Sequence, residues 1–198
     1  MPSFSSSEKS LLRRELRARR RALSLFDQRR AARALAQTLV RLPQLKVARH
    51  VALYWPNDGE IDPRALLRMR ALSRCRFYLP VLQSFPSSTL GFAPWRGERR
   101  LVRNRFGIPE PHASRLQPVQ KMDVVLLPLT GFDAAGNRLG MGGGFYDRTL
   151  AFLRRCPRPS PRLIGVAHAC QQAPALPAEN WDVRLQLIVT DRDVISSR

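Results

Sequence analysis

Cysteine is scarce in this sequence, and the few cysteines present follow no metal-binding pattern. Cys75, Cys156 and Cys170 are far apart in the chain and form no CxxC motif. An odd number of widely spaced cysteines argues against a disulfide framework and against a zinc site. We therefore expect buried spectator thiols in a protein of the reducing cytoplasm.

Long apolar runs are also missing. No stretch approaches the roughly 20 apolar residues that a membrane-spanning helix needs. The first twenty residues are rich in Ser and Arg, but they lack the apolar stretch of about 7–15 residues found in a secretory signal. They also carry Glu8 and Glu15. We expect a mature cytoplasmic N-terminus and no membrane partner.

The sequence contains none of the common signatures of zinc or nucleophilic catalysis. His50, His112 and His168 show no metal-ligand spacing, and there is no HExxH motif. A GxSxG nucleophile elbow is absent as well. Both kinds of chemistry are therefore disfavoured.

Positive charge is what the chain has in excess. Its net charge is +19, and 31 of the 34 basic residues are Arg. Such a surplus predicts attraction to polyanions, such as nucleic acid, nucleotides or a polyglutamate tail. The alternative is a merely solvated basic surface. Aromatic residues are not interleaved with a basic stripe, and no RNP, KH or helix-turn-helix pattern occurs. The charge permits nucleic-acid binding, but we do not expect it.

Helical periodicity marks the N-terminal part of the chain. Leucines at helical spacing predict a helix over 7–23. Ser24 with Asp27 predicts a second helix start, and the stripe that follows ends at Pro43. A third helix is predicted over 62–72, because proline is favoured at the first helical position.

Short apolar runs predict the strands. We expect them at 50–55, 75–82, 90–95, 123–133, 162–168 and 185–191. A further helix is predicted over 146–155. Helices that alternate with apolar strands indicate an α/β fold with a mostly parallel sheet flanked by helices, a Rossmann-like three-layer arrangement. We expect one domain over 1–198, with the helical segment of about 7–42 packed on the α/β core.

The segment "RLGMGGGFYDR", residues 138–148, has four glycines in five positions. They cost about 2–4 kcal/mol of conformational freedom relative to alanine. The segment fits neither GxxxxGK[ST] nor GxGxxG, because Phe145 occupies the last glycine position. It lies between the strongest predicted strand and a helix, where backbone N–H groups can converge on an anion.

Two side chains add to this prediction. Arg138 can donate a forked pair of hydrogen bonds to a phosphate. Asp147, in the first turn of the following helix, can bind a magnesium ion. The alternative is a tight turn in which Asp147 only caps the helix.

Other candidate residues are weaker when each is taken alone. Lys9 and Arg13 are four apart on the first helix and can clasp phosphates, although a solvated face is the simpler interpretation. Glu60 follows a strand and can accept hydrogen bonds from a ligand, or it is an ordinary loop acid. Trp55 can stack on a flat ring or belong to the core. Asp182 is a single acid near another strand.

Taken together, these segments resemble a known family. The motifs are "KSLLR" with "RRALS", "YWPNDGEIDPRAL", "NRFGIPEP", "DVVLLPLTGFDAAGNRLGMGGGFYDR" and "IGVAHACQQ…LPAENWDVRLQLIVTD". In this order they resemble the 5-formyltetrahydrofolate cyclo-ligase (5,10-methenyltetrahydrofolate synthetase) family over almost the whole chain. The resemblance implies ATP- and Mg²⁺-dependent cyclisation of 5-formyltetrahydrofolate to 5,10-methenyltetrahydrofolate, with release of ADP and phosphate, in a monomer.

The resemblance also implies roles for residues of this chain. Arg138 and Tyr146 are the expected catalytic residues, and Asp147 and Asp182 the expected magnesium carboxylates. The implied ATP contacts are Lys9, Arg13, Arg138, Leu139, Gly140, Met141, Gly142, Gly143, Gly144, Phe145 and Tyr146. The implied folate contacts are Trp55, Glu60, Met141, Gly142, Gly143, Gly144 and Phe145. The alternative is a nucleic-acid-binding or regulatory protein on the same fold without cyclo-ligase activity.

Overall fold

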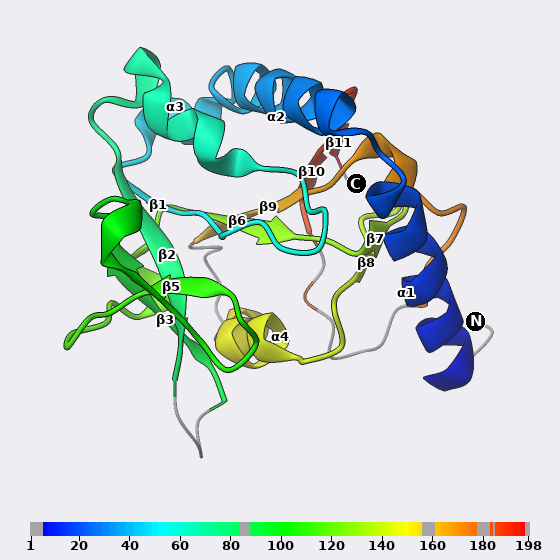
Figure 1. Ribbon diagram of the computed structural model, residues 1–198. Helices are drawn as coiled ribbons and strands as arrows, with labels where there is room; N and C mark the ends of the chain where they lie inside the picture. Colours follow the sequence, from blue (N-terminus) through cyan, green and yellow to red (C-terminus); the bar gives the residue numbers. More distant parts are fainter. Residues whose placement is uncertain (1–5, 84–87, 156–160, 178–182, 184, 197–198) are drawn as a thin grey trace.

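The described residues of the computed structural model are 6–83, 88–155, 161–177, 183 and 185–196. Within them, seven strands form the central sheet (Figure 1). In sheet order they are β11 (Val194–Ser196), β10 (Leu187–Val189), β9 (Arg162–Val166), β6 (Val124–Pro128), β1 (His50–Ala52), β2 (Arg76–Leu82) and β3 (Leu90–Pro94).

The centre of the sheet is parallel, as predicted. β2, β1, β6, β9 and β10 all run in one direction, with Ala52 opposite Val125 and Val125 opposite Leu163. Only the outer strands are antiparallel, β3 on β2 and β11 on β10. The predicted α/β fold with a mostly parallel sheet is confirmed.

Alternation along β6 explains how both faces of the sheet are buried. Val124 and Leu126 belong to one apolar cluster, and Val125 and Leu127 belong to the other. All four side chains are almost completely buried. Successive strand residues point to opposite faces, so a continuous apolar run requires cover on both sides.

Helices provide that cover. α2 (Leu25–Leu39) packs with α3 (Pro43–Val47) on one face, and α4 (Phe145–Leu150) lies on the other (Figure 1). Ser24 caps α2, because its hydroxyl accepts a hydrogen bond from the Asp27 N–H at 3.1 Å. This confirms the second helix start.

α1 (Ser6–Arg21) lies beside the hairpin of β7 (Gly131–Phe132) and β8 (Arg138–Leu139) (Figure 1). A Cβ added to Gly131 would lie 2.3 Å from Cδ1 of Leu16, so the helix and the hairpin are in direct contact. This contact brings the N-terminal helix to the start of the glycine-rich segment.

Several predicted elements differ from the observed ones. The predicted helix over 62–72 consists of two 3₁₀ turns, because its capping hydrogen bonds run to the third residue back, as from Met69 to Leu66. The predicted helix over 146–155 is α4 followed by another 3₁₀ turn. The short 3₁₀ turns are η1 (Pro63–Arg68), η2 (Arg70–Leu72), η3 (Glu98–Arg100), η4 (Val119–Lys121), η5 (Ala151–Arg154) and η6 (Ala169–Gln171).

The predicted strands are also longer than the observed ones. The run 123–133 divides into β6 and β7, because the chain leaves the sheet after Leu129 and turns into the β7–β8 hairpin. The pair β4 (Leu101–Arg103) and β5 (Pro109–Pro111) was not predicted.

The described thiols are Cys75 and Cys170, both free and half-buried rather than fully buried as expected. Cys156 lies outside the described residues. Among the described helices, none is long and apolar enough to cross a membrane.

Candidate active site

A pocket of about 610 Å³ lies where the parallel strands end. Tyr54 and Trp55, which follow β1, and Pro128 at the end of β6 line it. The glycine-rich segment and the start of α4 form one wall. Ligands of open α/β sheets bind at this edge, outside the carboxyl ends of the strands.

The pocket brings together the predicted site residues that the structure describes. Lys9 and Arg13 reach it from α1, and Trp55 and Glu60 reach it from the loop after β1. The whole segment from Arg138 to Asp147 lines it. Asp182 lies outside the described residues. No group of three or more metal-ligating side chains occurs within the described part of the chain.

The glycine-rich segment has a backbone that side chains would disturb. Gly142 and Gly144 adopt left-handed conformations, with φ of +97° and +64°. A Cβ added to Gly144 would lie 2.7 Å from Nη1 of Arg148. The positive φ favours glycine at this position, and a larger residue would also displace the Arg148 side chain.

Two arginines hold the loop by its carbonyl groups. Arg13 Nε donates to the Gly140 carbonyl at 3.0 Å, and Arg148 Nη2 donates to the Gly143 carbonyl at 2.8 Å. Both cations therefore lie directly against the loop. Their charges favour an anion there.

Arg138 and Asp147 contact one another as an ion pair. Arg138 also donates through Nε to the Val183 carbonyl at 3.1 Å, and its side chain is 6% exposed, whereas that of Asp147 is 37% exposed. The residues predicted to serve phosphate and magnesium therefore neutralise one another in this structure. Asp147 remains accessible from the pocket.

Tyr146 lines the pocket, and its hydroxyl is buried. Among the described residues this hydroxyl has no hydrogen-bond partner. Burial raises the pKa of Tyr146 above its ordinary value, and nearby Glu60 raises it further. The phenol therefore stays protonated and can donate to a bound ligand.

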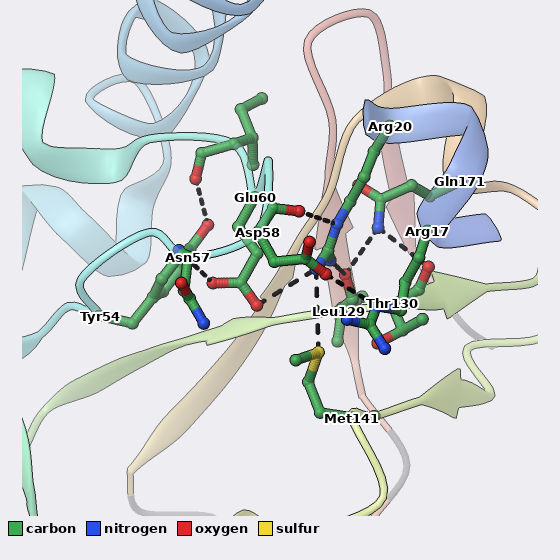
Figure 2. Close-up of polar contacts among 12 residues, drawn as sticks. Arg17, Arg20, Tyr54, Asn57, Asp58, Glu60, Leu129, Thr130, Met141 and Gln171 are labelled. Carbon is green, nitrogen blue, oxygen red and sulfur yellow. Dashed lines mark hydrogen bonds and ion pairs between the residues drawn. The ribbon is translucent and has the colours of Figure 1, made fainter. Parts of the chain in front are cut away.

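Glu60 is the buried acid of the pocket, in a turn that begins at Asn57. The Asn57 N–H donates to Glu60 Oε2 at 3.0 Å. Burial raises the pKa of Glu60 to about 7, against the opposing effect of the Arg20 guanidinium. Figure 2 shows this carboxylate between Asn57 and Arg20.

Aromatic rings lie at two places around the pocket. Trp55 stacks with Trp95 at 5.9 Å between ring centroids. Phe106, which is 54% exposed, meets Phe145 edge-on at 5.8 Å. Arg105 lies over both phenylalanine rings.

The segment 104–110 forms part of the pocket wall, although no role was predicted for it. The Asn104 side chain accepts hydrogen bonds from the N–H groups of Phe106 and Ile108 and donates one to Glu110 Oε2 at 3.0 Å. Glu110 Oε2 also accepts from the Leu82 N–H at 3.1 Å, which ties the segment to β2. In the sequence, only the motif "NRFGIPEP" marks this segment.

The fold and pocket define a class: an α/β protein with a ligand pocket at the strand ends and a glycine-rich wall flanked by cations. Residues 5–191 match the model of the 5-formyltetrahydrofolate cyclo-ligase family. The chain belongs to this family.

Individual relatives agree with this assignment. The chain is 37% identical to the 5-formyltetrahydrofolate cyclo-ligase of Haemophilus influenzae over 184 residues, which cover 92% of this chain and 97% of the relative. It is 38% identical to that of Escherichia coli K12 over 181 residues, covering 90% and 98%.

A solved structure resembles the fold. The 5,10-methenyltetrahydrofolate synthetase of Aquifex aeolicus superposes with a TM-score of 0.79 at 30% identity, covering 96% of this chain and 93% of that one.

Proposed function

We propose that the protein catalyses the ATP- and Mg²⁺-dependent cyclisation of 5-formyltetrahydrofolate to 5,10-methenyltetrahydrofolate, releasing ADP and phosphate. Membership of the cyclo-ligase family supports the reaction class. The observation that carries the proposal is the convergence of Lys9, Arg13, Glu60 and the segment 138–147 on one pocket.

ATP lies along the glycine-rich wall in this proposal. The left-handed glycines leave room for phosphates to approach the backbone, and the N-terminus of α4 follows directly. Lys9 and Arg13 extend from α1 toward the same wall. Arg138 through Tyr146 complete the ATP contacts.

Asp147 fits the role of a magnesium ligand, and Asp182 is its proposed companion. The Asp147 carboxylate lines the pocket and is accessible. Magnesium with phosphates commonly uses one or two protein carboxylates and keeps several waters. When bound, the ion neutralises charge on the phosphates. Asp147 would hold the ion in place of its present contact with Arg138, and Arg138 would then be able to donate to phosphate oxygens.

The folate occupies the opposite side of the pocket. The Glu60 carboxylate accepts hydrogen bonds from N–H groups of the pterin ring, and Trp55 lines the same side. The segment from Met141 to Phe145 contacts the folate as well as ATP in this proposal. The Tyr146 hydroxyl, which lacks a described partner, is free to donate at the junction of the two substrates.

The chemistry requires no protein nucleophile. The formyl oxygen takes the γ-phosphoryl group, and ADP leaves. N10 then attacks the activated carbon, which forms the second C–N bond, and loses its proton; the C–O bond breaks and phosphate departs. Such a reaction relies on positioning and on stabilisation of charge, which Arg138, Tyr146 and the loop N–H groups can supply.

The test is the appearance of the methenyl chromophore when purified protein, 5-formyltetrahydrofolate, ATP and Mg²⁺ are mixed. We expect product only in the complete mixture. No chromophore, together with RNA binding that weakens steeply with salt, would instead favour the nucleic-acid-binding alternative. We further propose a cytoplasmic monomer, to be checked by fractionation and light scattering.

A further inference from the structure

Arg20 of the arginine-rich helix α1 is completely buried. Its guanidinium donates to the Asp58 carbonyl at 2.8 Å, to Asp58 Oδ2 at 3.1 Å and to the Leu129 carbonyl at 3.3 Å (Figure 2). A buried guanidinium is costly unless its donors are paired. These contacts offset the cost.

Two further contacts of Arg20 lead into the pocket. Nη1 lies 3.9 Å from Glu60 Oε1, and Nη2 lies 3.8 Å from Met141 Sδ. Figure 2 shows the guanidinium between the turn that carries Glu60 and the glycine-rich segment. One side chain of α1 therefore connects both walls of the pocket.

The turn 57–60 has an unfavourable backbone conformation that contacts from α1 stabilise. Asp58 and Gly59 are both left-handed, with φ of +54° and +76°. Residues other than glycine adopt a left-handed conformation at a cost. Arg17, Arg20 and Arg21 all pair with the Asp58 carboxylate, so one face of α1 holds the turn.

We propose that Arg20 is a positioning residue that fixes the turn 57–60 and holds the Glu60 carboxylate ready for the pterin ring. This inference rests on the proposed function and deepens it. Arg20 acts through Glu60 and needs no contact with the folate. Arg21 pairs with the same aspartate but makes no described contact with Glu60, so it provides a matched comparison.

The protonation of Glu60 gives the inference a distinctive signature. The titratable and charged groups facing Glu60 are Arg17, Arg20, Asp58, Tyr54 and Tyr146. Burial raises the pKa of Glu60 to about 7, and the Arg20 guanidinium is the largest opposing influence. Without that cation the acid would lose its proton only at higher pH.

The experiment compares wild type with Arg20→Met and Arg21→Met. The pH profile of kcat/KM for 5-formyltetrahydrofolate should show its acid limb raised by about one unit or more in Arg20→Met. In Arg21→Met the limb should stay in place. Binding of 5-formyltetrahydrofolate without ATP, followed by tryptophan fluorescence, should weaken in Arg20→Met and recover at high pH.

If Arg20→Met fails to fold, Arg20→Lys tests the positioning role of Arg20 independently. A lysine keeps the positive charge but loses the several hydrogen-bond donors of the planar guanidinium. The KM for 5-formyltetrahydrofolate should therefore rise severalfold, while the acid limb of the kcat/KM profile stays near that of wild type. An acid limb in Arg20→Lys that lies near the wild-type position supports the proposal. A wild-type KM in Arg20→Lys overturns it.

Two further outcomes would contradict the positioning role of Arg20. An unmoved limb in folded Arg20→Met, or an equal shift in Arg21→Met, would reduce Arg20 to a structural residue. Failure of the proposed function would look different, because wild type itself would neither bind 5-formyltetrahydrofolate nor form the methenyl product.

Discussion

Arg138 and Asp147 form an ion pair in the wall of the pocket, nine residues apart across the glycine-rich segment. The pair joins β8 to the first turn of α4. Because the proposed ligands of these two side chains have opposite charges, binding of Mg-ATP would separate the pair and use both partners. The ion pair is then a resting arrangement of the site.

Replacement of Asp147 tests this arrangement. We expect Asp147→Asn to lower kcat by about two orders of magnitude, the size of losing one charge contact in the transition state. The free energy of unfolding should fall by about 1–3 kcal/mol, because the buried Arg138 guanidinium loses a charged partner but keeps its hydrogen bond to the Val183 carbonyl. Asp27→Asn, which breaks the Arg30 pair far from the pocket, serves as the control. Full activity in Asp147→Asn would remove the metal role.

Tyr146→Phe should lower activity without lowering the free energy of unfolding. The buried hydroxyl has no described partner, so its removal should leave the free energy of unfolding unchanged or raise it by about 1 kcal/mol. The variant should nevertheless lose at least about tenfold in kcat, if the hydroxyl donates to the reacting groups. Chemical denaturation and the chromophore assay measure the two effects. A less stable but fully active variant would contradict the assignment.

Gly144→Ala should damage both the loop and the activity. Alanine in a left-handed conformation costs about 1–2 kcal/mol, and its Cβ would also crowd Nη1 of Arg148. Gly140→Ala is the matched control, because Gly140 has no left-handed φ and an added Cβ would meet nothing within 4 Å. Equal loss of thermal stability in both variants would argue against this account of the loop.

Glu60 should make stability depend on pH with a definite sign. Its pKa in the folded protein, about 7, exceeds the ordinary value of 4.5, so between these values the folded state binds more protons than the unfolded state. The contribution of Glu60 to the free energy of unfolding therefore falls as pH rises through this window, by about 3 kcal/mol.

The comparison with Glu60→Gln isolates this effect. The variant should lack the Glu60 contribution to the pH slope, and it should bind 5-formyltetrahydrofolate more weakly above pH 7. Urea denaturation of both proteins across the window checks the first expectation. Parallel slopes for wild type and variant would show that Glu60 does not titrate there.

Phe106→Ala tests the pocket wall that sequence reasoning did not assign. Phe106 lines the pocket and is half-exposed, so its loss should raise the KM for 5-formyltetrahydrofolate severalfold. Stability should change by no more than about 0.5 kcal/mol. Val102→Ala, an exposed residue of β4 away from the pocket, should leave KM unchanged. An unchanged KM in Phe106→Ala would exclude the ring from the site.

The parallel sheet and much of the pocket were predictable because their signals are local. Continuous apolar runs such as 124–127 indicate buried strands, and a glycine-rich turn before a helix indicates an anion site. Because the glycine-rich turn follows the buried strand in the chain, it is expected at the edge of the sheet where that strand ends. Lys9, Arg13 and Glu60 were weak candidates when each was taken alone, and the family resemblance is what assigned them to one site.

The rest depends on contacts between distant segments. Arg20 looks like any other arginine of α1, and its burial follows from bonds to Asp58 and Leu129, which lie 38 and 109 residues away. The Arg138–Asp147 pair depends on the path of the loop between them. The 3₁₀ turns after Asp62 likewise reflect packing that helical propensity does not describe.

The most direct test of the central claim is the stoichiometry of ADP and methenyltetrahydrofolate in one reaction. A single pocket that joins phosphoryl transfer to ring closure predicts equal amounts of the two products, and neither product when either substrate is omitted. Methenyltetrahydrofolate formed without ATP, or ADP released at the full rate without 5-formyltetrahydrofolate, would contradict it.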